Sequence, residues 1–78
     1  MTGDQIRAGR ALIRWTIEVL ADRSKVSATT IKRAENTDGP LRMTAANASA
    51  IRAALEAGGV EFIDPNGGGP GVRLRRQA

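Results

Sequence analysis

The chain contains neither cysteine nor histidine among its 78 residues. Without cysteine it can form no disulfide and no thiolate metal site, and without histidine it lacks the most frequent metal ligand and the usual general base. The acidic residues also form no paired constellation that would suit acid–base chemistry. The sequence therefore predicts a protein that is not an enzyme and that carries no metal and no cofactor.

Long hydrophobic runs are absent as well. No apolar segment approaches the roughly 20 residues of a membrane span, and the start of the chain, Met1 to Asp4, lacks the basic and apolar stretches of a signal peptide. The glycine-rich stretch 67–71 lacks the Lys-Ser/Thr pair and the following helix of a phosphate-binding loop. We therefore expect a cytoplasmic, nucleoid-associated protein with no membrane contact and no nucleotide site.

The length of the chain allows one small domain. A core of this size is marginal because a short chain buries a smaller fraction of its surface than a long one. Since disulfides and thiolate metal sites are excluded, oligomerisation is the remaining way to add buried surface. The sequence therefore predicts a homodimer.

The charge of the chain is basic and unevenly spread. The net charge is +4 and the sequence pI is about 11.1. The excess lies in residues 23–42, with five basic and two acidic side chains, and in residues 72–78, with three arginines and no acid. Such clustering favours a nucleic-acid partner. One tryptophan and one phenylalanine form no platform on which the bases of a single strand could stack.

Four segments begin with the signature of a helix N-terminus. Thr2 and Gln5 form a capping-box pattern, and Thr16, Ser27 and Thr44 are further N-caps. Trp15 with Leu20, and Val26 with Ile31, occupy the two positions of a hydrophobic staple around the second and third caps. The predicted helices span residues 3–14, 17–24, 27–35 and 45–57, and a fifth helix is left open. We expect Ile6, Gly9, Leu12 and Ile13 to form the apolar face of the first.

The last twenty residues change character. Segments 60–63 and 72–75 alternate apolar and charged residues, and segment 64–71 between them consists of turn residues. This pattern predicts a β-hairpin, with a disordered tail as the competing interpretation. We therefore divide the chain into a helical domain, 1–58, and a C-terminal hairpin, 59–78, and expect the hairpin to mediate dimerisation through residues 60–75.

The segment between 17 and 34 predicts two short helices joined by a tight turn. Ala21 is small where the helices must approach, and Val26 and Ile31 are apolar where the crossing must be fixed. In residues 16–35, Thr-Ile-Glu-Val-Leu-Ala-Asp-Arg-Ser-Lys-Val-Ser-Ala-Thr-Thr-Ile-Lys-Arg-Ala-Glu, the sequence resembles the Xre/Cro-type repressors. The resemblance covers about residues 3–57. It implies a mainly α fold, a four- to five-helix repressor-like helix-turn-helix domain, here followed by the hairpin.

The resemblance also implies a function and a site. Helix 27–35 would lie in the major groove of an operator, so the implied partner is double-stranded DNA and the protein would be a sequence-specific transcriptional regulator, most simply a repressor. Thr29 and Thr30 match base-edge positions, Ala28 a methyl-contacting position, and Arg33 a position for a bidentate guanine contact. The complete set implied to bind DNA is Ser27, Ala28, Thr29, Thr30, Lys32, Arg33, Asn36 and Arg42. Arg10 and Glu35 match a partly buried structural ion pair.

Two departures from the family pattern keep an alternative open. Ile17 replaces a glutamine that commonly grips a phosphate, and Lys25 replaces the usual glycine of the turn. If the turn keeps a positive φ, Lys25 is modestly strained. Ile17 and the bare Ala28 favour a second hypothesis, a protein-interaction module such as an antitoxin or an anti-activator, which would bind a protein partner.

The C-terminal arginines have two interpretations. Arg73, Arg75 and Arg76 could form an arm that touches DNA, or they could keep the edge of the hairpin from aggregating. The sequence does not separate these roles.

Overall fold

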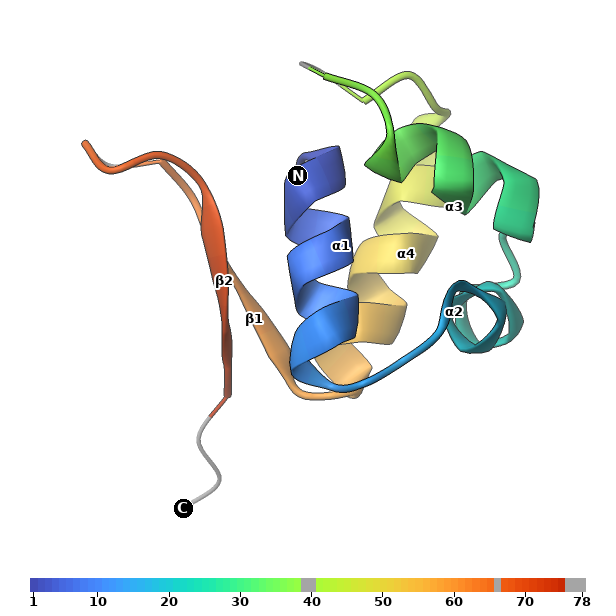
Figure 1. Cartoon of the computed structure of the whole chain (residues 1–78), viewed down its shortest axis with the longest axis horizontal. Helices are drawn as coiled ribbons and strands as arrows, with labels where there is room; N and C mark the ends of the chain where they lie inside the picture. The colour runs from blue at the N-terminus through green and yellow to red at the C-terminus, as the bar shows by residue number, and fades with distance from the viewer. Residues whose placement is uncertain (39–40, 66, 76–78) are drawn as a thin grey trace.

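The computed structural model describes residues 1–38, 41–65 and 67–75 and confirms a mainly helical fold with a C-terminal hairpin (Figure 1). The described part of the chain holds four helices, so no fifth helix occurs there. The elements are, in order, α1 (Gly3–Leu12), α2 (Ile17–Ser24), α3 (Ala28–Glu35), α4 (Ala45–Ala57), β1 (Val60–Ile63) and β2 (Gly71–Leu74). In these ranges no helix has the length and apolar character needed to cross a membrane.

The helices begin where the sequence predicts. The side chains of Thr2, Thr16, Ser27 and Thr44 each accept a hydrogen bond from the backbone N–H three residues later. The capping box at the start of α1 is complete, because the Gln5 side chain also accepts the backbone N–H of Thr2 at 2.8 Å. These caps satisfy N–H groups that have no partner inside their own helix.

The predicted end of the first helix is wrong by two residues. Helix α1 ends at Leu12, because Ile13 leaves helical geometry and Arg14 adopts a left-handed conformation with φ of 57°. The backbone N–H of Trp15 then returns to the carbonyl of Arg10 at 3.0 Å. The predicted apolar face is also wrong at Leu12, which is 39% exposed, since the chain turns away at the last helical position and leaves it uncovered.

One hydrophobic core joins all four helices to the first strand. Helix α1 supplies one buried residue. Helices α2 and α3, with the turn between them, supply four, α4 supplies three, and β1 supplies one. These buried residues are Ile6, Leu20, Val26, Ile31, Ala34, Ile51, Ala54, Leu55 and Val60. Ile13, Trp15 and Ala21 pack against the cluster while partly exposed, so the staple residues and the small residue of α2 lie against the core as predicted.

The hairpin is antiparallel and is held against α1. Val60 pairs with Leu74 and Ile63 with Gly71. The buried amide of Gln5 donates to the carbonyls of Ile63 and Gly71, at 3.3 and 2.9 Å, while its oxygen holds the start of α1. Every hydrogen-bonding group of this amide is therefore engaged, as a buried amide requires. A residue predicted only to cap a helix thus also fixes the hairpin.

Candidate nucleic-acid interface

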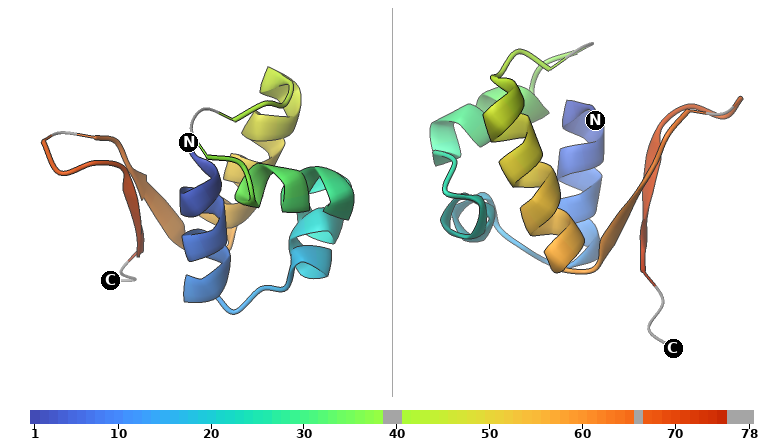
Figure 2. Two further views of the ribbon diagram at one scale, coloured as in Figure 1. Left: turned by 45° about the horizontal axis from the view of Figure 1, so that its top comes forward. Right: turned by 180° about the vertical axis from the view of Figure 1, so that it is seen from behind.

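Helices α2 and α3 form a helix-turn-helix pair at one end of the molecule. Three residues, Lys25 to Ser27, connect them, and the turn keeps a positive φ, of 61°, at Lys25. The Ser24 hydroxyl accepts the backbone N–H of Val26 inside the turn. Figures 1 and 2 show this pair on one side of α1 and α4, with the hairpin on the other side. The pair is therefore remote from the hairpin.

Helix α3 has one buried face and one exposed face. Ile31, Ala34 and Glu35 are buried, which is the helical spacing expected for a face that meets the core. The opposite face carries exposed polar and basic residues over the whole length of the helix, and these are Thr29, Lys32, Arg33 and Asn36. Five of the eight residues implied to bind DNA belong to α3 itself. The first turn of the helix contains no acidic residue.

The remaining implied residues lie at the start of α3 or in the segment between α3 and α4. Ser27, the N-cap, is exposed, and Ala28 and Thr30 are half-buried. The Ser27 hydroxyl donates to the Thr30 hydroxyl at 2.9 Å, which leaves Thr30 its own proton to donate. Arg42 is exposed between α3 and α4.

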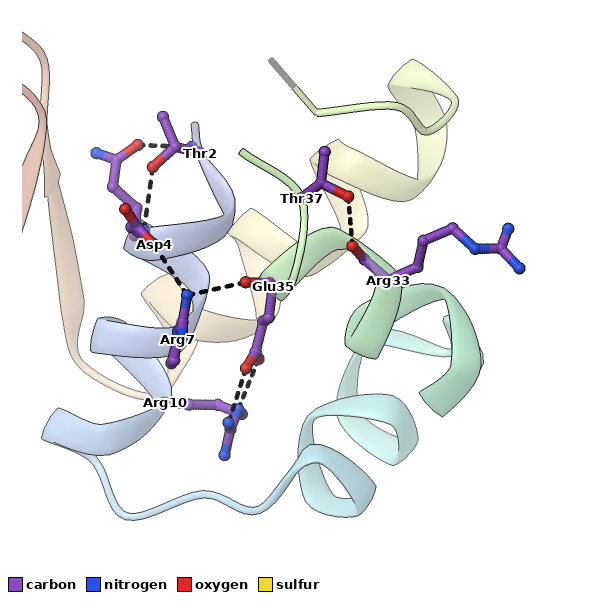
Figure 3. Close-up of polar contacts among 8 residues, drawn as sticks. Thr2, Asp4, Arg7, Arg10, Arg33, Glu35 and Thr37 are labelled. Atoms are coloured by element: carbon purple, nitrogen blue, oxygen red, sulfur yellow. Dashed lines mark hydrogen bonds and ion pairs between the residues drawn. The ribbon is translucent and has the colours of Figure 1, made fainter. Parts of the chain in front are cut away.

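The C-terminal end of α3 is fixed by two arginines of α1. Arg10 forms a bidentate pair with Glu35, with both N–O distances 2.8 Å, and so confirms the expected ion pair (Figure 3). The Glu35 side chain is 5% exposed and that of Arg10 19%. Hydrogen bonding to Glu35 raises the pKa of Arg10, which keeps its charge. A third Arg10 bond reaches the carbonyl of Trp15 at 2.9 Å, so the pair also holds the loop before α2.

Arg7 supplies a second anchor that sequence reasoning missed. Its guanidinium donates to the backbone carbonyl of Glu35 at 2.9 Å and contacts the Asp4 carboxylate at the same distance. A cation beside the last carbonyls of a helix complements the helix dipole. Arg7 therefore caps the C-terminal end of α3 from outside. The sequence gives no periodic signal for this contact, because 28 residues separate the two groups.

Gly3 makes the closest approach between α1 and α3. A Cβ atom at this position would lie 2.1 Å from the backbone oxygen of Ala34. No side chain can therefore be accommodated without moving one of the two helices. The sequence places Gly3 at a helix start but cannot show which backbone passes over it.

Arg33 extends from α3 into solvent, away from α1 (Figure 3). Its backbone carbonyl accepts the Thr37 hydroxyl at 2.6 Å, which ties the following loop to the end of the helix. The side chain itself is exposed. The arrangement leaves the guanidinium available to an external acceptor.

The C-terminal arginines lie away from this face. Arg73 pairs with Glu61 across the hairpin, and the backbone N–H of Arg75 donates to Gly59 at 2.7 Å. Both belong to the end of the molecule opposite α3 (Figure 1). Arg76 lies outside the described residues. The two described arginines do not share a surface with the exposed face of α3.

The described residues contain no group of three or more acidic, histidine or cysteine side chains that could hold a metal ion. Comparison with known proteins gives no further assignment, because no family model matches the chain and no curated protein is found to match its sequence.

Proposed function

We propose that the protein is a sequence-specific, DNA-binding transcriptional regulator that inserts α3 into the major groove. The observation that carries this proposal is the division of α3 into a buried apolar face and an exposed face with Thr29, Lys32 and Arg33. An α-helix fits the major groove, and these side-chain types suit base edges, thymine methyls and phosphates. The protein would act by equilibrium occupancy of an operator, without chemistry.

The anchoring of α3 supports the same proposal. Arg7, Arg10 and the close contact at Gly3 hold the helix to α1 at its C-terminal end, and the Ser27 cap fixes its start. A helix that reads base edges must present its side chains in one orientation, since a misplaced donor loses its bond. The resemblance to the Xre/Cro-type repressors points to the same use of this helix.

Alanine substitutions at Arg33 and Arg42 should have different consequences. We expect Arg33→Ala to reduce the preference for the operator over scrambled DNA by about 5- to 150-fold, since a bidentate base contact discriminates by about 1–3 kcal/mol. The resemblance implies that Arg42 holds the DNA backbone, so Arg42→Ala should weaken binding to both DNAs about equally and lower the slope of log affinity against log salt by about 1. Fluorescence anisotropy on DNA from upstream of the protein's own gene measures both quantities.

Both positions are exposed, so neither variant should unfold the chain, and thermal melts of the two proteins serve as the control. Equal loss of specific and non-specific binding by Arg33→Ala would remove the proposed base contact.

We propose further that two copies bind a two-fold operator and pair through the edge of β2. A single small module binds weakly, and a symmetric dimer on two half-sites multiplies its contacts. The two-stranded sheet leaves one edge of each strand without a partner among the described residues. Leu74, the most exposed large hydrophobic residue at 53%, lies on β2. The edge is remote from α3 (Figure 1), so pairing leaves the recognition helix free.

Leu74→Pro should break this dimer and keep the fold. The backbone N–H of Arg75 donates to the carbonyl of Gly59, so these two residues face each other as a hydrogen-bonded pair. Hydrogen-bonded and non-hydrogen-bonded pairs alternate along an antiparallel sheet. The N–H of Leu74, one residue earlier, therefore points away from β1. Proline there removes only the outer donor, and an edge strand tolerates it. Loss of two symmetric bonds should weaken the dimer about 10- to 100-fold in analytical ultracentrifugation.

Leu74→Thr is the matched control, because it removes the exposed apolar side chain and retains the N–H. Truncation after residue 58 is a poorer test, since Val60 is fully buried in the core. A Leu74→Pro protein that dimerises as tightly as the wild type would contradict pairing through this edge.

A second candidate function rests on the apolar exposure of α2. Val19 is 36% exposed and Ile17 is half-buried at the start of the helix, where a DNA-binding surface would favour polar groups. These residues favour a protein-interaction module, for which binding to operator and scrambled DNA would be equally weak.

A further inference from the structure

In the described part of the chain, only two residues other than glycine adopt a left-handed backbone conformation, and both are basic. Arg14 has φ of 57° and Lys25 has φ of 61°. Residues with a Cβ atom rarely adopt this region, and glycine occupies it without steric cost. Lys25 directly follows α2 and Arg14 follows the last residue of α1 by two positions, and glycine is the usual residue with this conformation just after a helix. The chain therefore accepts backbone strain at two sites that glycine would relieve.

Neither side chain offsets this strain through contacts inside the protein. Lys25 makes one ion pair, with Asp22 at 3.8 Å, and both side chains are more than three-quarters exposed, so the pair contributes little. Arg14 forms no ion pair and no side-chain hydrogen bond with the described residues and is exposed. What both positions have in common is a solvated positive charge.

The two positions are equivalent with respect to the helix-turn-helix pair. Arg14 precedes Thr16, the N-cap of α2, by two residues, and Lys25 precedes Ser27, the N-cap of α3, by two residues. The loop that carries Arg14 is tied to α1 and α3 through the Arg10 bond to the Trp15 carbonyl. The two charges thus flank α2 on a rigid frame that also carries the recognition helix.

We infer that Arg14 and Lys25 act through their charge, as contacts to phosphates of the DNA backbone at the two ends of α2. Strained residues persist where function requires them, and here the strain is coupled to a cationic side chain at both sites. The inference rests on the proposed function and adds two contacts outside the recognition helix. On α2, between the two positions, the acidic Glu18 and Asp22 outnumber the basic Arg23. The attraction therefore depends on local contact with phosphate and not on a broad positive field.

Glycine and glutamine variants separate charge from strain. Arg14→Gly and Lys25→Gly remove both, and each should raise Tm by roughly 2–6 °C, because relief of strain exceeds the added flexibility of the unfolded chain. Each should also weaken DNA binding about 3- to 10-fold near 0.1 M salt and reduce the slope of log affinity against log salt by about 1. Arg14→Gln and Lys25→Gln should weaken binding equally without the rise in Tm.

Arg75→Gln is the control for loss of one positive charge, since Arg75 directly follows β2 and its backbone N–H bonds to Gly59, which leaves it outside α2 and α3 and their connections. Anisotropy on the upstream DNA and thermal melts supply the two readouts. If the wild type binds DNA and the glycine variants bind no more weakly than Arg75→Gln, the inference is wrong and the proposed function stands. A wild type that fails to bind duplex DNA overturns both.

Discussion

Replacement of Arg10 by alanine is expected to destabilise the fold by about 3–5 kcal/mol, the usual cost of removing one partner from a buried ion pair. The change leaves the Glu35 carboxylate, 5% exposed, without its bidentate donor and takes a hydrogen bond from the Trp15 carbonyl. A chain of 78 residues has a total stability of about 4–12 kcal/mol. Urea unfolding followed by circular dichroism should therefore show a large loss or complete unfolding at room temperature.

The double variant Arg10→Met with Glu35→Met is the matched control. A buried apolar pair of similar size avoids the desolvated charge, so this protein should recover most of the lost stability. Because the bond to Glu35 raises the pKa of Arg10, the stability contributed by the charged guanidinium is fully present below the ordinary pKa of arginine and is lost only at higher pH. An Arg10→Ala protein as stable as the wild type would refute the structural role of the pair.

Alanine at Gly3 is expected to cost about 3 kcal/mol, at the upper end of the effect of overpacking a core. The new Cβ atom would lie 2.1 Å from the Ala34 oxygen and 3.0 Å from its carbonyl carbon. Since both atoms belong to the backbone, no rotamer change can relieve the clash, and α1 must separate from the end of α3. Chemical denaturation measures the loss, and weaker binding to operator DNA should accompany it.

Gly9→Ala is the control for this prediction. Its Cβ would meet the Cγ1 of Val60 at 3.3 Å, a side-chain atom that can shift, and alanine favours the helix by about 1 kcal/mol. Its stability should therefore remain within about 1 kcal/mol of the wild type. Equal stability of the Gly3 and Gly9 variants would mean that the close contact between α1 and α3 is absent.

Local signals predicted most of the fold. The four N-caps fix where the helices begin, because the hydroxyl at each cap bonds to a neighbour three residues away. The alternation of residues around the turn-rich segment 64–71 likewise predicts the hairpin. The end of α1 was missed because Arg14 adopts a conformation usually reserved for glycine, and sequence alone gives no sign of that.

The support of the candidate site could be predicted only in part. The Arg10–Glu35 pair followed from the family resemblance and is confirmed. The hydrogen bonds from Arg7 to the Glu35 carbonyl and from Gln5 to the hairpin were not anticipated. Each joins segments distant in the chain, and each accepting group is a backbone carbonyl. Because every residue has such a carbonyl, the sequence does not mark the acceptor. Such contacts emerge only when the helices are placed in space.

Whether α3 reads an operator is decided by the affinity of the wild-type protein for DNA from upstream of its own gene, compared with scrambled DNA, over a series of salt concentrations. We expect a preference of about 10³-fold or more for the upstream DNA and a linear fall of log affinity with log salt. Equal, weak binding to both DNAs would contradict the proposal that α3 reads an operator and would direct attention to a protein partner.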